Sequence, residues 1–314
     1  MNPLHVCIAD EHWYPASIGG MASGRVFDCL AKGLAELGHR VSYLISGCLV
    51  PLPPGVAMVC EVPAHADIIH VAEPSLIEKL GLEDRLWIRT RHVDSTLRGI
   101  PRTILPNTIY VSRTLAAMYG SENFVWNGID PGEFFYSEDK QDYVLFLCGL
   151  DRAIDKGWEL ALAAARQTGV RLVLGGSSAD PRVTARFTRI CAENRIEYAG
   201  EVWGARRAAL LAHARALLFP TQWNESFGLV IAEALMSGTP VISSNRGACP
   251  ELISPDVGFL CDSIDAYADA IRRACEISPA ACRAKAMRDF HYRSMATAYV
   301  ARYRQFLANY TSDR

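Results

Sequence analysis

The sequence lacks the features that mark several large classes of protein. No run approaches about 18 apolar residues, so we expect no membrane-spanning helix. The chain enters an apolar strand within its first few residues with no basic segment before it, so no signal peptide is evident. The formal net charge of −2 gives no electrostatic reason to expect nucleic acid. These absences predict a cytoplasmic protein with no nucleic-acid partner and at most peripheral membrane contact.

Patterns typical of metal sites and disulfides are also missing. The 10 cysteines are scattered without a Cys-x-x-Cys pair, which argues against a zinc site. A disulfide framework is unexpected in a chain of this length that lacks an export signal, so we expect reduced, buried thiols. No Asp-x-Asp occurs anywhere. We therefore predict that the protein holds no metal ion and needs no cofactor.

What the sequence does contain is a regular alternation of short apolar strands and helices. Half of its 314 residues are hydrophobic, and the length suggests about two domains. Residues 4–9 and 143–148 are unbroken apolar runs, as in parallel strands buried on both faces. The alternation predicts an α/β protein with two doubly wound, Rossmann-like domains. A polar segment around residues 136–142 places the boundary between them, giving domains 1–136 and 137–290.

Two glutamates bracket the most informative stretch. Glu225 and Glu233 enclose an apolar segment that we interpret as the start of a helix capped by Ser226. The helix dipole would favour an anion at the amides near this start. Those amides belong to Phe227, Gly228, Leu229 and Val230.

A helix would separate the two carboxylates by about 12 Å, at about 1.5 Å per residue. That distance is too long for the two groups to share one metal ion or one proton. It suits an elongated ligand with a negative middle, such as a nucleoside diphosphate sugar, whose sugar and ribose hydroxyls lie at opposite ends. An amphipathic helix with two solvated glutamates is the alternative interpretation.

The segment from Glu225 to Glu233 resembles the Glu-x7-Glu motif of retaining glycosyltransferases with the GT-B fold, family 4 in particular. The order Glu-Ser-Phe-Gly-Leu-Val-Ile-Ala-Glu carries the likeness, and the Gly-Thr-Pro-Val-Ile segment 238–242 follows in register. The Asn-Gly-Ile-Asp segment 127–130 resembles the one that leads into the interdomain linker of these enzymes. The resemblance implies that Glu225 contacts the donor sugar and that Glu233 holds the ribose hydroxyls.

A loop after the first strand of the second domain resembles the phosphate-binding segment of the same family. The family pattern Gly-Arg-x-x-x-x-Lys-Gly is matched by Gly149 and by Lys156 with its following glycine, but Leu150 replaces the arginine. The resemblance implies that Lys156, with Arg152 in place of the absent arginine, neutralises the donor diphosphate. Near residue 203 the chain resembles the segment beside the nucleoside base, so Trp203 either packs on the base or belongs to the core.

The first domain offers candidates for the other side of the reacting centre. Gly19 and Gly20 follow the first strand only after a long loop, which disfavours the tight Gly-x-Gly-x-x-Gly turn of a dinucleotide oxidoreductase. The resemblance implies that they face the donor phosphates and the acceptor. His92, after a strand, matches in element order the family histidine that faces the reacting centre. His70 lies in mid-strand, where a satisfied core histidine is expected.

Arginines gather around the same strand of the first domain. A solvated, ion-paired face is the simpler interpretation of this cluster, and an anionic acceptor or a membrane surface is the alternative. The arginines are Arg85, Arg89, Arg91, Arg98 and Arg102.

The resemblance covers nearly the whole chain and implies a two-domain GT-B glycosyltransferase whose terminal helix, 291–314, crosses back to the first domain. The expected reaction transfers a sugar with retention from a nucleoside diphosphate sugar, with UDP as the expected nucleotide, to a hydroxyl of an unidentified glycan, lipid-linked sugar or natural product. A UDP-sugar 2-epimerase and a catalytically silent sugar-nucleotide-binding module stay open as alternatives.

Overall fold

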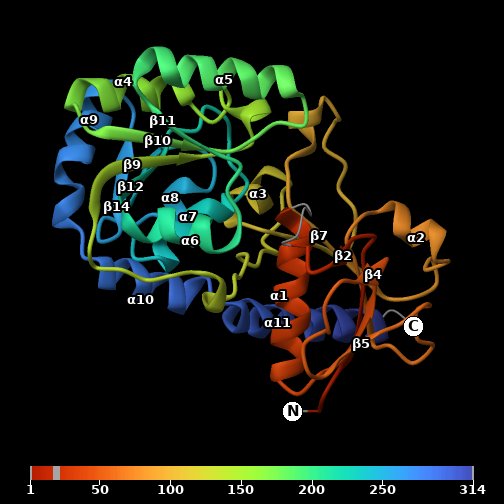
Figure 1. Cartoon of the computed structure of the whole chain (residues 1–314). Coiled ribbons are helices and arrows are strands. Elements are labelled where there is room, and N and C mark those ends of the chain that lie inside the picture. The colour runs from red at the N-terminus through yellow and green to blue at the C-terminus, as the bar shows by residue number, and fades with distance from the viewer. Residues whose placement is uncertain (1, 17–21, 313–314) are drawn as a thin grey trace. The chain divides into compact units, whose positions relative to one another are not determined.

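The computed structural model describes residues 2–16 and 22–312 and divides into two compact units (Figure 1). One unit comprises Met1–Asp130 with Asp289–Arg314, and the other comprises Pro131–Arg288. The expected domain boundaries, after residues 136 and 290, lie a few residues further along the chain. Each unit is an α/β layer structure around its own parallel sheet, as the alternation of apolar runs and helical patterns predicts.

The first unit is built on a six-stranded sheet whose strands all run parallel. Its central strand β1 (His5–Ala9) is buried along its whole length, which explains the unbroken apolar run. The strands β2 (Trp13–Tyr14) and β4 (Gly47–Cys48) form a separate two-stranded parallel sheet. The order of the large sheet is β5 (Val56–Met58), β3 (Arg40–Leu44), β1, β6 (Ile68–Val71), β7 (Trp87–Arg91), β8 (Thr108–Tyr110).

The terminal helix α11 (Tyr292–Ser312) packs against α1 (Ala22–Glu36) of the first unit (Figure 1). The two helices approach closely at Gly33, where an added Cβ would lie 2.7 Å from the Cβ of Ala296. The chain therefore returns to its first unit at its end, as the sequence predicts. The shorter helical segments of this unit are α2 (Ser75–Lys79), η1 (Ser95–Arg98) and α3 (Arg113–Met118).

The second unit has the same plan with helices on both faces of its sheet (Figure 1). Trp158, Phe187 and Tyr267 bring α4 (Trp158–Thr168), α5 (Pro181–Asn194) and α9 (Ile264–Arg273) into one hydrophobic core against one face. The other face carries α6 (Gly204–His213), α7 (Leu229–Met236) and α8 (Cys249–Leu252); the remaining helical segments are η2 (Pro131–Glu133), η3 (Leu150–Arg152), η4 (Ala274–Glu276) and α10 (Pro279–Asp289). The parallel sheet order is β11 (Glu197–Gly200), β10 (Arg171–Gly175), β9 (Gln141–Leu147), β12 (Ala214–Phe219), β13 (Val241–Ser244), β14 (Gly258–Cys261).

The order of the second sheet decides which loops meet. Strands β9 and β12 are hydrogen-bonded neighbours although they are far apart in sequence. Because both run in the same direction, the loops that leave their carboxyl ends lie at the same edge of the sheet. These are the loops 148–157 and 220–228, which carry the two strongest motifs of the sequence.

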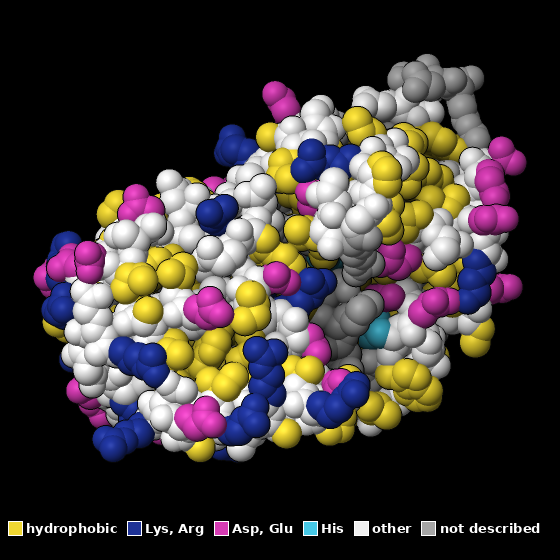
Figure 2. Space-filling view, turned by 90° about the horizontal axis from the view of Figure 1, so that it is seen from above, with side chains coloured by type: hydrophobic (Ala, Val, Ile, Leu, Met, Phe, Trp, Pro, Cys, Tyr) yellow, Lys and Arg dark blue, Asp and Glu magenta, His cyan; other side chains and the backbone are white. Residues whose placement is uncertain are grey.

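The described chain carries no disulfide and no helix suited to a bilayer. None of the ten cysteines is paired with another, and six of them are buried. Two thiols, those of Cys60 and Cys275, are exposed rather than buried as expected. Across residues 2–16 and 22–312 no helix is long and apolar enough to cross a membrane. Figure 2 shows basic and acidic side chains interspersed over the visible face, in keeping with the net charge of −2.

A buried polar chain fastens α11 to the first sheet. Tyr303 contacts Nδ1 of His70 at 2.6 Å, and Thr90 contacts Nε2 at 2.9 Å. The hydroxyl of Tyr299 lies 2.7 Å from that of Thr90. Burial lowers the pKa of His70 to about 3, so the ring is neutral at neutral pH. The expectation that His70 is a satisfied core histidine is confirmed.

We predict that Tyr303→Phe lowers the free energy of unfolding by about 1–3 kcal/mol, because it leaves one nitrogen of His70 buried without a partner. Tyr310→Phe on the same helix is the matched control, since its hydroxyl bonds a backbone carbonyl in an exposed setting. Urea denaturation of both variants measures the difference. An equal loss in the two would contradict the role given to the buried chain.

Candidate functional site

A lysine and a glutamate form an ion pair at the carboxyl edge of the second sheet. The ammonium of Lys156, in the loop after β9, donates to Oε2 of Glu225, in the loop after β12. Both side chains are recessed, with exposed fractions of 16% and 12%. The indole of Trp223 donates to the same oxygen at 3.1 Å, and its ring centroid lies 4.4 Å from Nζ of Lys156. Trp223 thus contacts both members of an ion pair whose residues are 69 positions apart in the sequence.

Only one carboxylate oxygen of Glu225 accepts hydrogen bonds from other side chains of the described chain. Both donors, Lys156 and Trp223, bond Oε2. Within the described chain Oε1 has no hydrogen-bond donor, and it is not sealed from solvent. Glu225 therefore presents a fixed acceptor oxygen to any hydroxyl that enters the site.

Arg152 lies on the same ring as Lys156. Its guanidinium carbon is 5.1 Å from the centroid of Trp223, and Nη1 pairs with Asp155 at 3.1 Å in a half-exposed setting. Leu150, at the position where the family pattern has arginine, is buried in the core with 2% exposure. Gly149 has open space where its Cβ would stand. The structure therefore brings Arg152 beside Lys156, while its proposed role toward a diphosphate stays a prediction.

Close backbone contacts fix the two loops. Gly157 adopts a φ of +80°, and a Cβ there would lie 2.0 Å from the carbonyl oxygen of Pro220. Gly247 adopts a φ of +56°, and its Cβ would lie 2.2 Å from the amide nitrogen of Glu225. The amide of Ala248 donates to the carbonyl of Glu225 at 2.8 Å. Only glycine fits at these two positions without moving the loop that carries the carboxylate.

The start of α7 differs from the expectation. The helix begins at Leu229, and its first turn is entered through Gly228, with a φ of +79°. Ser226 is buried and lies too far before Leu229 to cap the helix, so the predicted cap is wrong. The physical reason is that Phe227 enters the core, with 2% exposure, and Gly228 then turns the chain into the helix. The separation of about 12 Å, which assumed a helix from residue 225 onward, does not apply.

The start of α7 nevertheless offers backbone amides that could bind an anion. No side chain caps α7. The first amides of a helix have no intrahelical acceptor, and the dipole favours negative charge there. The amides of Leu229 and Val230 therefore stay suited to a phosphate, as the sequence suggests. Gly228 lies against this loop, since its Cβ would be 3.3 Å from Cγ of Glu225.

Glu233 is buried on α7 rather than open to solvent. Its carboxylate, 1% exposed, pairs with Nη2 of Arg207 on α6. The Nε of Arg207 is buried without a hydrogen-bond partner in the described chain. A ribose could reach Glu233 only if Arg207 shared or yielded this contact. The expected ribose role stays a prediction, and Arg207 joins the residues that would decide it.

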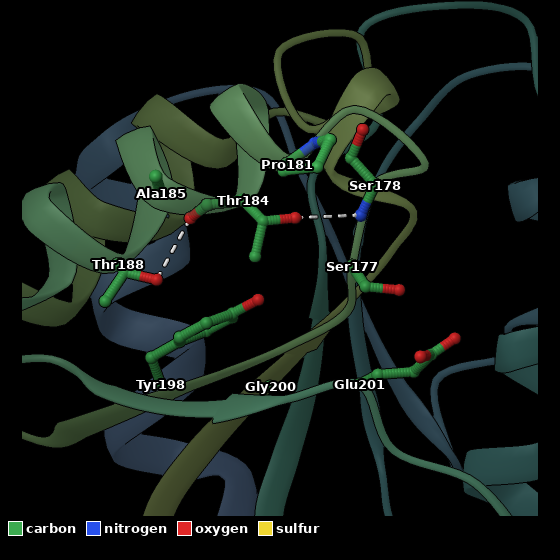
Figure 3. Close-up of a pocket in the computed structure, with 9 residues that line it drawn as sticks. All are labelled: Ser177, Ser178, Pro181, Thr184, Ala185, Thr188, Tyr198, Gly200 and Glu201. Atoms are coloured by element: carbon green, nitrogen blue, oxygen red, sulfur yellow. Dashed lines mark hydrogen bonds between the residues drawn. The ribbon is translucent and has the colours of Figure 1, made fainter.

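A pocket of about 540 Å³ opens at the carboxyl ends of β10 and β11 (Figure 3). Thr184 accepts a hydrogen bond from the amide of Ser178 at 3.2 Å, and the hydroxyl of Tyr198 donates to the carbonyl of Gly176 at 2.8 Å. Trp203 is half exposed and does not line this pocket. The lining residues are Ser177, Ser178, Pro181, Thr184, Ala185, Thr188, Tyr198, Gly200 and Glu201.

The sequence also predicts three site residues in the first unit, namely Gly19, Gly20 and His92. Gly19 and Gly20 lie outside the described residues. His92 packs edge-on against Phe27, with ring centroids 5.6 Å apart. Its Nε2 is buried with no hydrogen-bond partner in the described residues, and burial lowers its pKa to about 4. Convergence of these residues with Lys156 and Glu225 on one site stays a prediction.

Three residues of the site were not predicted from the sequence. Trp223 stands two positions before Glu225, so its place in the motif was the available signal. Arg207 and Gly247 could not be found in this way, because their contacts with Glu233 and Glu225 arise only in the folded chain. In the described part of the chain, no group of three or more His, Cys, Asp or Glu side chains is placed to hold a metal ion.

Comparisons with known proteins agree with these observations. The family described as glycosyl transferases group 1 matches residues 141–276, which span most of the second unit. A GDP-mannose-dependent alpha-(1-6)-phosphatidylinositol dimannoside mannosyltransferase of Mycobacterium tuberculosis is 36% identical over 126 residues, 39% of this chain and 31% of that protein. A D-inositol 3-phosphate glycosyltransferase of Mycolicibacterium paratuberculosis is 30% identical over 167 residues, 48% of this chain and 38% of that protein. The chain spans about a third of the length of such relatives.

Among solved structures the likeness extends over nearly the whole chain. AviGT4, a glycosyltransferase involved in avilamycin A biosynthesis, superposes with a TM-score of 0.78 at 27% identity, covering 98% of this chain and 99% of that one. The resemblance to group 1 glycosyltransferases and the two-domain GT-B fold are confirmed.

We predict that Gly247→Ala lowers the melting temperature much more than Gly169→Ala, because only at residue 247 does the added Cβ meet backbone. Gly169 also has a positive φ, of 73°, but open space around its Cβ, so it controls for backbone strain alone. Thermal denaturation of the two variants measures the difference. Equal losses would show that the loop around Glu225 is not held in the way described.

Proposed function

Because the chain is related to the group 1 glycosyltransferases through residues 141–276 and has the GT-B fold, we propose that it transfers a sugar from a nucleoside diphosphate sugar to an acceptor hydroxyl. The observation that carries the proposal is the Lys156–Glu225 pair on Trp223, beside the uncapped start of α7. This arrangement offers cations and amides for a diphosphate next to a fixed carboxylate oxygen for sugar hydroxyls.

The charges of the site suit departure of a nucleoside diphosphate. Breaking the bond between the anomeric carbon and the phosphate oxygen leaves negative charge on the diphosphate, which fixed cations and amides stabilise as it develops. Lys156 and Arg152 supply the cations, and the amides of Leu229 and Val230 supply hydrogen-bond donors. Glu225 holds the sugar through Oε1 while Lys156 holds Oε2.

We further propose retention of configuration by attack on the same face of the sugar. The acceptor oxygen forms its bond to the anomeric carbon as the phosphate oxygen leaves, and the acceptor proton passes to the departing diphosphate. The transition state has the oxocarbenium character of other glycosyl transfers. This route needs no metal ion and no enzyme nucleophile, and insensitivity of the rate to EDTA is its consequence.

The nucleotide base has a candidate pocket in the same unit. The pocket beside Tyr198 lies at the carboxyl ends of β10 and β11, where an open parallel sheet binds ligands. UDP is the nucleotide expected from the sequence, whereas the mycobacterial relative in this region is named for GDP-mannose. Both nucleotides therefore belong in any binding test.

We predict that UDP or GDP raises the melting temperature of the protein, because a ligand that binds only the folded state stabilises it by RT ln(1 + [L]/Kd). Lys156→Met should abolish most of this shift. Lys79→Met, which removes an equal charge from an exposed pair with Glu11, should leave the shift intact. No shift with any nucleotide would count against the proposed donor site.

Product analysis separates transfer from the alternatives. Proton NMR of UDP-glucose or GDP-mannose incubated with the protein and a panel of hydroxyl acceptors should show release of nucleoside diphosphate that depends on acceptor. Glu225→Ala should abolish this turnover, and Glu276→Ala, which removes an exposed carboxylate paired with Arg273 outside the site, should retain most of it. Epimer formation without acceptor would favour the 2-epimerase, and nucleotide binding without any turnover would favour the silent binding module.

A further inference from the structure

Arg89 is a buried arginine without an acceptor. It lies on β7 of the first unit with an exposed fraction of 5%. Its guanidinium donates to no other described residue, and its Nε is sealed from solvent without a partner. A buried charge that lacks both a counter-ion and hydrogen bonds destabilises the folded state. A group outside the described chain is therefore expected to complete this site.

Arg91 lies two residues further along β7, on the same face of the strand, and also has no acidic partner in the described chain. Its two Nη atoms donate to neutral oxygens, the hydroxyl of Tyr119 at 3.1 Å and the carbonyl of Thr103 at 3.4 Å. Its Nε is also buried without a partner in the described chain. Burial, and after it the neighbouring charge of Arg91, lower the pKa of Arg89.

The carboxylates nearby do not neutralise these two arginines. Asp94 accepts from Nε and Nη2 of Arg102, at 3.1 and 2.9 Å, and from the hydroxyl of Tyr119 at 2.9 Å. Glu73 is exposed, and its charge raises the pKa of Arg89 less than burial and Arg91 lower it, without an ion pair between the two in the described chain. Arg89 and Arg91 thus form no ion pair in the described chain, and the guanidinium carbon of Arg91 lies 4.6 Å from the ring centroid of Tyr119.

The position in the fold suits a ligand. Arg89 pairs in register with Thr108, and Arg91 with Tyr110 at the carboxyl end of β8. In an open parallel sheet the carboxyl edge is where ligands bind. The opposite edge of the same sheet begins with residues such as Arg40, an exposed arginine at the start of β3.

We propose that Arg89 and Arg91 form a binding site for the terminal phosphate monoester of a small molecule. Guanidinium groups bind phosphate oxygens in a bidentate manner. A phosphate monoester carries about −1.5 to −2 charge at pH 7, which matches two uncompensated cations better than one carboxylate does. Because Arg89 is recessed, only a terminal group reaches it. That the phosphate belongs to the sugar acceptor rests on the proposed function, whereas phosphate binding itself does not.

This site revises the interpretation of the arginine cluster. Arg102 has its carboxylate partner, and Arg85 donates to the carbonyls of Pro63, Ala64 and Ala66 at 3.1 to 3.2 Å. Those two arginines are structural, as the ion-paired interpretation expects. Arg89 and Arg91 fit the other interpretation, in which an anionic group meets the cluster.

Thermal denaturation with inorganic phosphate, at constant ionic strength set with chloride, tests the site without any donor. We expect phosphate to raise the melting temperature of the full chain. Arg89→Met should melt at the same or a higher temperature without phosphate, since it removes an unpaired buried charge, and should lose the phosphate shift. Arg91→Met should lose most of the shift as well. Arg40→Met, which removes an equal charge from the opposite edge, should keep it.

Two further controls test whether the rise in melting temperature with phosphate has another origin. Lys156→Met should keep it, because the proposed site does not involve the diphosphate loop, and acetate should give a much smaller shift than phosphate. The proposal is overturned by a wild-type protein that does not respond, by a shift that survives Arg89→Met and Arg91→Met, by a shift lost in Lys156→Met alone, or by acetate acting as strongly as phosphate. Since no sugar nucleotide is present, such a failure leaves the proposed transfer untouched.

Discussion

The ion pair between Lys156 and Glu225 is the contact on which the second unit's site depends. It joins the loops of two neighbouring parallel strands, and Trp223 fixes it by donating to the shared oxygen and by lying under the ammonium. The pair is possible only because backbone approaches backbone at two glycines, Gly157 against Pro220 and Gly247 against Glu225. The sheet order brings the loops together, the glycines let them close, and the ion pair sets the direction of the carboxylate.

The same contact gives Glu225 two different oxygens. One is neutralised by Lys156, and the other faces the site without a donor from the described chain. A carboxylate held in this way can accept a hydrogen bond from a hydroxyl group while its own orientation is fixed. Group transfer is faster when the groups that bind the substrate are fixed in this way before the reaction. The uncapped start of α7 and the nearby Arg152 add positive potential at the same edge of the sheet.

Much of this could be predicted from the sequence, because the informative signals were local. Buried parallel strands are short apolar runs, and the motifs around Lys156 and Glu225 stand directly after two of them. The capping role of Ser226 could not be judged locally, since the burial of Phe227 and the left-handed turn at Gly228 are decided by tertiary packing.

Contacts between residues far apart in the chain also could not be predicted from the sequence. The contact of Arg207 with Glu233 joins two helices, and its consequence for ribose binding follows only from burial. The arginines after residue 84 look alike in sequence. Their different partners, carbonyls for Arg85, a carboxylate for Arg102 and neither for Arg89, become visible only once the strands are paired.

We infer that the Lys156–Glu225 pair belongs to a nucleoside diphosphate site. A crystal structure of the protein with bound UDP or GDP tests it most directly. We expect the diphosphate to lie within hydrogen-bond distance of Nζ of Lys156 and of the amides of Leu229 and Val230, with the base in the pocket beside Tyr198. A nucleotide bound elsewhere, with the ion pair and the start of α7 left untouched, would contradict it.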